Sequence, residues 1–186
     1  MDMLTGPSRF RRNRGATLIE QIMVLTILAT LTCVALPSLG SVLTRNQLRT
    51  AQADFIAALQ HARGLAVHTG SRTIFCPTRD SHSCSDEIQW GGGWLLGHNR
   101  QYKDQPDGAP SRAGHSHGEQ INILGTAGRR RIQFQADGSA GGSNITLLLC
   151  VRGKSDQALS VVVSNAGRIR GARATADQAV RCAATS

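Results

Sequence analysis

The feature that most constrains this chain is a long apolar stretch close to its N-terminus. From Ala16 to Leu43 the only ionisable side chains are those of Glu20 and Cys33. The stretch is 28 residues long, whereas a helix needs only about 20 apolar residues to cross the hydrocarbon core of a bilayer. We therefore expect residues 16–43 to form one transmembrane helix.

Basic residues lie immediately before this stretch, and none lies within it. The leader, residues 1–15, contains Arg9, Arg11, Arg12 and Arg14. Because positively charged flanks stay on the cytoplasmic side of a membrane, we expect the leader to remain inside and the rest of the chain to be exported.

The helical pattern continues beyond the apolar stretch. In residues 44–69 apolar side chains recur at helical spacing, which predicts an amphipathic second half of the same helix. Its apolar positions are Leu48, Ala51, Phe55, Leu59, Ala62 and Ala66. Gly70 is a suitable stop, so we expect one helix from about Thr17 to His68. A cleavable secretory signal would have a shorter apolar region of about 7–15 residues, and is disfavoured.

Residues 14–20, with the sequence RGATLIE, resemble the leader junction of type IV pilins and of the pseudopilins of type II secretion. The resemblance implies that a prepilin peptidase cuts between Gly15 and Ala16, and that the new N-terminus at Ala16 is methylated. It also implies a bacterial inner-membrane protein with one span and a periplasmic head, which then enters a pilus or pseudopilus.

Glu20 is an expensive residue at this place. An unpaired acidic side chain costs about 2.5–3.5 kcal/mol at the centre of a membrane helix. In the resembled family the carboxylate pairs with the N-terminus of a neighbouring subunit, which would make Glu20 an assembly residue with other pilins as partners. The alternative is a glutamate near the membrane boundary that contacts only lipid headgroups and water.

The chain after Gly70 has the pattern of an exported β-rich head, residues 70–186. Short β-type runs alternate with turn signals, and we expect strands at residues 72–76, 90–96, 131–135, 145–152, 159–164 and 168–173. Residues 97–120 are polar and are expected to form a long exposed loop. An antiparallel sheet packed on the amphipathic half of the helix would bury both apolar faces, giving an α+β fold.

Four cysteines lie in the head: Cys76, Cys84, Cys150 and Cys182. In an oxidising compartment an even number predicts two disulfides, for which three connectivities are possible. Proximity along the chain favours Cys76–Cys84 and Cys150–Cys182. Zinc is the competing interpretation because histidines lie nearby, but neither CxxC nor HxxxH spacing occurs, so we expect no metal.

The head also resembles one group within the pilin superfamily, the FimT/GspH minor pilins and pseudopilins. The resemblance is carried by residues 74–77, 84, 90–94, 132–134, 137–138, 149–150 and 161–170. It implies a type IV pilin-like fold, in which a long N-terminal helix packs on an antiparallel sheet. We find no enzyme motif, and expect no catalytic residue, cofactor or small-molecule substrate.

A short basic element suggests a nucleic-acid site. Residues 167–170, GRIR, match the GRxR element with which FimT-type minor pilins of transformable bacteria hold DNA. On a strand, Arg168 and Arg170 would share one face while Ile169 faces the core. Arg173 continues this segment, and Arg129, Arg130 and Arg131 form a second, weaker candidate cluster. The alternative is a solvated edge strand on which arginines only prevent aggregation.

The net charge of +9 favours polyanionic partners but also fits an ordinary solvated surface. Two functions therefore remain. The first is a minor type IV pilin that takes part in pilus assembly and binds the DNA backbone non-specifically during natural transformation. The second is a GspH-like pseudopilin of type II secretion that acts through protein contacts only.

Overall fold

The structure is a computed structural model that describes residue 15 and residues 17–117, 120–126 and 128–185. The chain divides into two compact units, Met1–Ser41 and Val42–Ser186. The buried core and both disulfides lie entirely within the second unit. Val42–Ser186 therefore has the core of a domain that can fold by itself.

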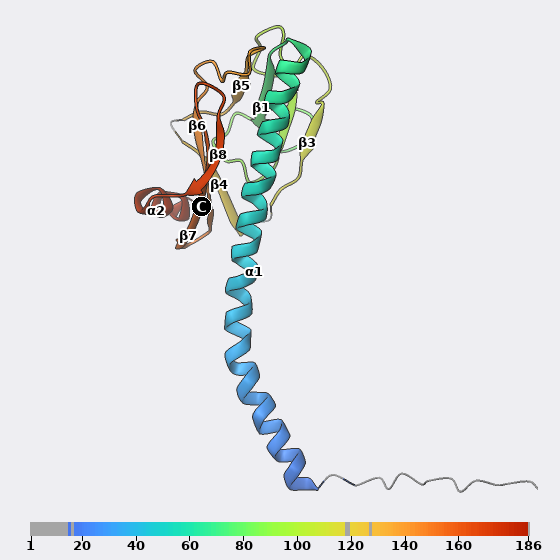
Figure 1. Cartoon of the computed structure of the whole chain (residues 1–186), viewed down its shortest axis with the longest axis vertical. Helices are drawn as coiled ribbons and strands as arrows, with labels where there is room; N and C mark the ends of the chain where they lie inside the picture. Colours follow the sequence, from blue (N-terminus) through green and yellow to red (C-terminus); the bar gives the residue numbers. More distant parts are fainter. Residues whose placement is uncertain (1–14, 16, 118–119, 127, 186) are drawn as a thin grey trace, which may run out of the picture. The chain divides into compact units, whose positions relative to one another are not determined.

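The expected long helix is confirmed as α1, Leu18–Thr69 (Figure 1). It ends at Gly70, whose φ of 59° is the left-handed conformation that commonly terminates helices. Between Leu18 and Leu31 its large apolar side chains are exposed, among them Leu18 at 80%. Over the part of the chain that the structure describes, no helix is both long enough and apolar enough to cross a membrane.

The head contains two antiparallel sheets rather than the single sheet that we expected. The first has the strand order β3-β2-β1-β5 and the second has the order β4-β6-β7-β8. The first consists of β1 Thr73–Pro77, β2 Trp94–His98, β3 Arg112–Gly114 and β5 Ile132–Phe134. The second consists of β4 Ile121–Gly125, β6 Ile145–Val151, β7 Lys154–Val163 and β8 Ile169–Arg173.

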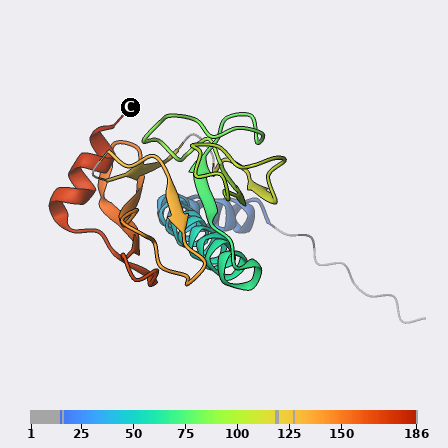
Figure 2. The same cartoon turned by 90° about the horizontal axis from the view of Figure 1, so that it is seen from above.

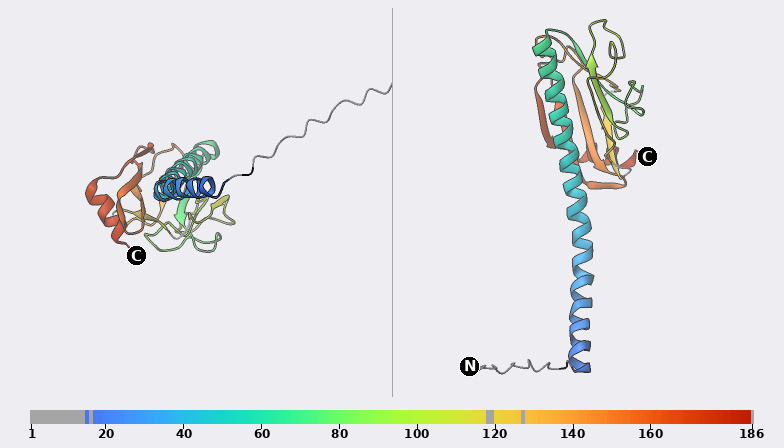
Figure 3. Two further views of the ribbon diagram at one scale, coloured as in Figure 1. Left: turned by 90° about the horizontal axis from the view of Figure 1, so that it is seen from below. Right: turned by 90° about the vertical axis from the view of Figure 1, so that its right-hand side faces the viewer.

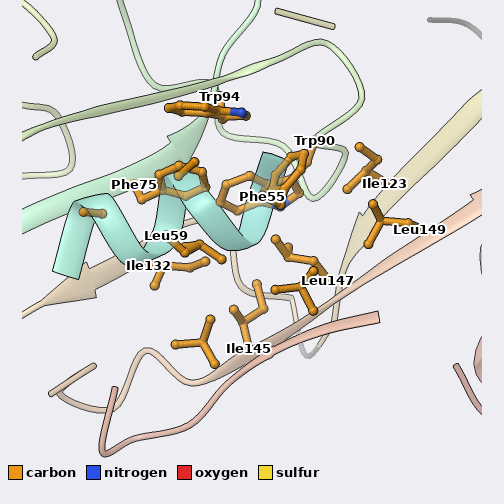
Figure 4. Close-up of a cluster of buried hydrophobic side chains, with 14 of the residues drawn as sticks. Phe55, Leu59, Phe75, Trp90, Trp94, Ile123, Ile132, Ile145, Leu147 and Leu149 are labelled. Carbon is orange, nitrogen blue, oxygen red and sulfur yellow. The ribbon is translucent and has the colours of Figure 1, made fainter. Parts of the chain in front are cut away.

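One core joins both sheets to the second half of α1. The six apolar helix positions predicted from the sequence are all buried there. At its centre the ring of Phe55 lies edge-on to the rings of Phe75 and Trp90, with centroid distances of 6.2 and 6.4 Å (Figure 4). Aliphatic side chains of β4 and β6, such as Ile123 and Leu147, close the core from the second sheet.

Four strands differ clearly from the sequence-based expectation, among them β7, which begins at Lys154 rather than at residue 159. Strands β3 and β4 were not predicted, and β3 falls within the expected long loop. The strand predicted at 90–96 begins only at Trp94, because Gly93 has a φ of 130° and turns the chain. A Cβ on Gly93 would lie 2.7 Å from the Gly114 carbonyl oxygen, so the turn requires glycine here.

A second helix, α2 Ala176–Ala184, was also not predicted. It is fixed at its start by a capping box, in which Thr175 Oγ1 accepts a hydrogen bond from the Gln178 backbone and the Gln178 side chain accepts one in return. The second sheet lies between α2 and the second half of α1 (Figure 2).

Both disulfides have the pairing that proximity favoured. Cys76 is bonded to Cys84, with their Cα atoms 5.5 Å apart, and Cys150 to Cys182, with theirs 6.1 Å apart. The second bond ties α2 to the outer face of β6. The four thiols are therefore unavailable as metal ligands.

Candidate nucleic-acid interface

Strand β8 is an edge strand that pairs only with β7 in its sheet. Ile169 pairs with Val163 and packs against the core, as expected for the residue between the two arginines. Arg168 directly precedes the strand and Arg170 lies within it, and both are exposed. By the alternation of side chains along a strand, the two arginines face away from the core.

Gly167 has a structural role that does not involve a ligand. Its φ is 73°, and a Cβ there would lie 1.8 Å from the Gly138 carbonyl oxygen. Its backbone N–H donates to the Ser164 carbonyl at 2.8 Å, which closes the β7–β8 turn. Packing thus accounts for the glycine and the isoleucine of the GRIR element, and leaves the two arginines without a structural explanation.

The guanidinium groups of Arg168 and Arg170 are free to bind an anion. Among the described residues, neither side chain takes part in a hydrogen bond or a salt bridge. The backbone beneath them is fixed, because the Arg168 N–H donates to Ser164 Oγ at 3.1 Å and Ser164 N–H donates to the Arg168 carbonyl at 3.0 Å. Two forked cationic donors on a rigid turn suit phosphate oxygens.

Helix α1 runs beside β8 (Figure 3) and packs on the core-facing side of its sheet. Gln52 Nε2 donates to the carbonyls of Ser160 at 2.8 Å and Ala172 at 3.1 Å. Gly171 lets the helix approach, since a Cβ there would lie 3.0 Å from the side chains of Gln52 and Ile56. Both carbonyls point into the β7–β8 ladder, so these contacts fix the sheet to the helix without covering the free edge of β8.

Arg173 lies on the opposite face of β8 from Arg170, because the two are three positions apart on the strand. It lines a pocket of about 120 Å³ together with Arg45 and Arg49 of α1. The structure thus separates Arg173 from the predicted pair and brings it to two arginines that the sequence analysis did not select. Only their helical spacing of four residues signals that Arg45 and Arg49 share a face.

The second predicted cluster is largely compensated by carboxylates. Arg130 forms a salt bridge of 2.6 Å with Asp86, and Arg131 contacts Asp86 at 3.2 Å and Asp104 at 3.1 Å. Arg129 contacts the side-chain oxygen of Asn144 at 3.5 Å. Two of the three charges are therefore neutralised locally, which makes this cluster a poorer phosphate site than Arg168 and Arg170.

The predicted processing and assembly residues lie at the other end of the chain. Residues 1–14 and Ala16 lie outside the described residues, whereas Gly15 is exposed. Glu20 is exposed in the first turn of α1, where a carboxylate interacts favourably with the helix dipole. Large apolar side chains surround it in sequence and are exposed as well, Ile19 at 65% and Met23 at 62%.

A second group of titratable side chains lies between α1 and β3. His117 Nδ1 is 4.0 Å from Asp54 Oδ2, and burial lowers the pKa of His117 although Asp54 raises it. His115 and Arg112 line the same groove. Within the described parts of the chain, no group of three His, Cys, Asp or Glu side chains is arranged to hold a metal ion.

Comparisons with known proteins agree with this fold. A family model described as type II transport protein GspH matches residues 51–167. A crystal structure of the type IV minor pilin FimU from Pseudomonas aeruginosa (strain PAO1) is similar, with a TM-score of 0.57 and 24% identity over 72% of this chain and 92% of that chain. In another crystal form FimU gives a TM-score of 0.54 and 22% identity, over 69% and 94% of the two chains.

No curated protein matches the chain significantly. At these identities the likeness to FimU establishes the fold, whereas the family model covers more than half of the chain and establishes the family. The chain belongs to the GspH family and has an α+β pilin-like fold.

Proposed function

We propose that this chain is a minor pilin of a type IV pilus whose head binds DNA non-specifically during natural transformation. The observation that carries the proposal is the pair of exposed guanidinium groups, Arg168 and Arg170, which have no partner among the described residues. They project from a turn in which packing explains the other two residues of the element, Gly167 and Ile169.

The chemistry of this pair fits the phosphate backbone. Residues two apart on a strand are separated by about 6.6 Å, so the two guanidiniums can contact separate phosphates of one nucleic-acid strand. Contacts to phosphates carry no sequence information, as the uptake of arbitrary DNA requires. With so few phosphates neutralised, a single head should bind near the non-specific range of about 10⁻⁴ to 10⁻⁶ M.

Export and assembly would precede DNA binding. In this proposal the prepilin peptidase removes residues 1–15, the amino group of Ala16 is methylated, and residues 16–43 anchor the head in inner-membrane lipid. Glu20 then pairs with the N-terminus of a neighbouring pilin. The exposed apolar side chains beside Glu20 support this step, since a row of this kind needs lipid or other helices around it.

A second candidate function is that of a structural pseudopilin in type II secretion. The matching family model favours it, because its description names a type II transport protein. Here the head would act through contacts with other pseudopilins only, and Arg168 and Arg170 would be solvated surface residues. Both candidates are structural roles within a pilin family rather than enzymatic ones.

DNA binding by the isolated unit Val42–Ser186 separates the two candidates. We expect Arg168→Ala with Arg170→Ala to weaken binding to labelled DNA in a polarisation titration. The slope of log affinity against log salt should fall by about one unit for each lost phosphate contact.

The matched control, Arg112→Ala with Arg181→Ala, removes the same charge elsewhere. Both arginines are exposed, and neither lies in the β7–β8 turn. An unchanged titration in the first double variant rejects this DNA site and favours the pseudopilin role. Equal losses in both double variants would show that net charge alone attracts DNA.

Assembly is tested by Glu20→Ala in the full chain. We expect the variant to fractionate with membranes as the parent does but to be missing from sheared filaments, because the pairing charge is lost. Glu20→Asp, which keeps the charge, should retain part of the incorporation. Normal incorporation of Glu20→Ala would disprove the assembly role.

A further inference from the structure

Five cationic side chains gather around the first helical turns of the compact unit Val42–Ser186. Arg45 and Arg49 occupy one face of α1, and Arg152, Lys154 and Arg173 come from the β6–β7 turn and the end of β8. We call this set the basic collar. All five side chains are exposed, and none of them is used by the proposed DNA site at Arg168 and Arg170.

The β6–β7 hairpin brings the collar together by reaching α1 at two places. On one side, a pocket of about 120 Å³ is lined by Arg45, Arg49 and Arg173 together with residues 156–159 of β7. On the other, a hollow of about 470 Å³ is lined by Thr44, Arg152 and Lys154. The hairpin thus places cations beside the first helical turns of the unit.

The charges of the collar are poorly compensated. Asp156 is the one carboxylate that lines either hollow among the described residues. No collar side chain forms a salt bridge with a described residue, and only Arg152 has a hydrogen-bond partner there, Asn122 Oδ1 at 3.4 Å. This contrasts with Arg130 and Arg131, which carboxylates neutralise.

The position of the collar along the chain indicates its partner. Arg45 and Arg49 come two and six residues after Leu43, the last residue of the apolar stretch. At about 1.5 Å per residue these steps are about 3 and 9 Å along a helix axis. The headgroup region adds only about 5–8 Å on each side of the hydrocarbon core, so both arginines would lie at or just above its phosphates.

We propose that the basic collar binds anionic phospholipid headgroups on the exported leaflet, and holds the head against the membrane before assembly. This inference rests on the membrane anchoring in the proposed function, but not on DNA binding. Each basic residue near an anionic surface adds attraction that is screened within a Debye length. Guanidiniums around a small pocket also provide several donors for one phosphate group.

Vesicle binding by Val42–Ser186 tests the collar without the N-terminal helix. We expect the unit to sediment with vesicles of phosphatidylglycerol and phosphatidylcholine, but not with phosphatidylcholine alone. Arg45→Ala with Arg49→Ala should lower the partition coefficient roughly 10- to 30-fold, the loss expected for two charges at such a surface. Alanine is favourable at these exposed helix positions, so folding should be preserved.

Arg168→Ala with Arg170→Ala is the matched control, and should bind the anionic vesicles almost as the parent does. In a DNA titration we expect the opposite result: Arg168→Ala with Arg170→Ala should weaken binding. Arg45→Ala with Arg49→Ala should bind DNA almost as the parent does. Absent binding to anionic vesicles, equal losses in both variants, or binding to phosphatidylcholine alone would each overturn the proposal. So would a loss of DNA binding but not of vesicle binding in Arg45→Ala with Arg49→Ala, which would assign the collar to DNA. A failed DNA site at Arg168 and Arg170 would leave the vesicle result unaffected.

Discussion

Replacing Gly167 by alanine should destabilise the head strongly although the side chain added is a single methyl group. Two separate penalties arise at this position. The φ of 73° is in the left-handed region, and the new Cβ would lie 1.8 Å from the Gly138 carbonyl oxygen. That oxygen accepts a hydrogen bond from Arg63 Nε at 3.0 Å, so the carbonyl cannot move away without weakening this bond.

The magnitude follows from adding these penalties. The left-handed conformation costs an alanine about 1–2 kcal/mol. Relieving the contact requires the turn at Gly138 and the β7–β8 turn to separate, which would also stretch the 2.8 Å bond from Ala140 N–H to the Asn165 carbonyl. Two weakened hydrogen bonds add about 2 kcal/mol, so Gly167→Ala should lose about 3–4 kcal/mol.

Gly153→Ala is the matched control, because Gly153 has a φ of 72° but a Cβ added there would have no atom within 4 Å. It should lose only the conformational part, about 1 kcal/mol after the smaller entropy of the unfolded chain is included. The melting temperature of Val42–Ser186 should fall by about 10 °C in Gly167→Ala and by about 3 °C in Gly153→Ala. Equal shifts would refute the reasoning that the contact with Gly138 determines the choice of glycine.

Four other predictions test the fold. Phe55→Ala, which removes a ring with 0% exposure, should cost about 3–5 kcal/mol in urea unfolding, and a loss below about 1 kcal/mol would contradict the assigned core. Cys150→Ala with Cys182→Ala opens a loop with a sequence separation of 32 and should cost about 4 kcal/mol by calorimetry; an unchanged transition would contradict this. Hydrogen bonds from the Ser83 and His82 backbones lower the pKa of Asp80 below its ordinary 3.8. The ionised carboxylate therefore stabilises the fold above that pH, and this stabilisation is lost as the pH falls below it. Asp80→Asn should flatten the decline in melting temperature between about pH 4 and 2, as thermal melts would show. Gly64→Ala, at an exposed helix position with nothing within 4 Å, should stabilise the head by about 1 kcal/mol, and a lower melting temperature would refute this.

The sequence predicted the parts of the fold that depend on local periodicity. The apolar positions of the helix recur every three or four residues, and each of those named is buried. The strand expected at 145–152 is observed as Ile145–Val151. The disulfide pairs followed from separation along the chain, because cysteines close in sequence can meet without long-range information.

The missed elements were short or depended on contacts distant in sequence. Strand β3 has three residues, too few to show an alternation, and it is held by pairing with β2. Helix α2 had a readable signal in the capping pair Thr175 and Gln178. The sequence-based prediction missed it because only nine residues follow as helix, less than a typical isolated helix requires.

The candidate site was predicted only in part, because spacing along the chain reveals local pairs but not contacts between distant residues. Local spacing identified Arg168 and Arg170, since two residues on one strand face are recognisable from sequence. It could not show that Asp86 neutralises Arg130 and Arg131, because 44 and 45 residues separate the partners. Nor could it show that Arg173 and Arg45 line one pocket, which requires β8 to lie beside α1.

The alternation of side chains along β8 divides one basic segment between two surfaces. Arg168 and Arg170 face outward at the β7–β8 turn, whereas Arg173 turns toward the helix and joins the basic collar. A protein that is first held at a membrane and later exposed in a filament can use such surfaces in succession, because releasing one does not occupy the other. If a single surface served both partners, anionic lipid would compete with DNA for the same arginines. The separation of Arg173 from Arg170 is therefore the structural condition on which the two proposed activities are compatible.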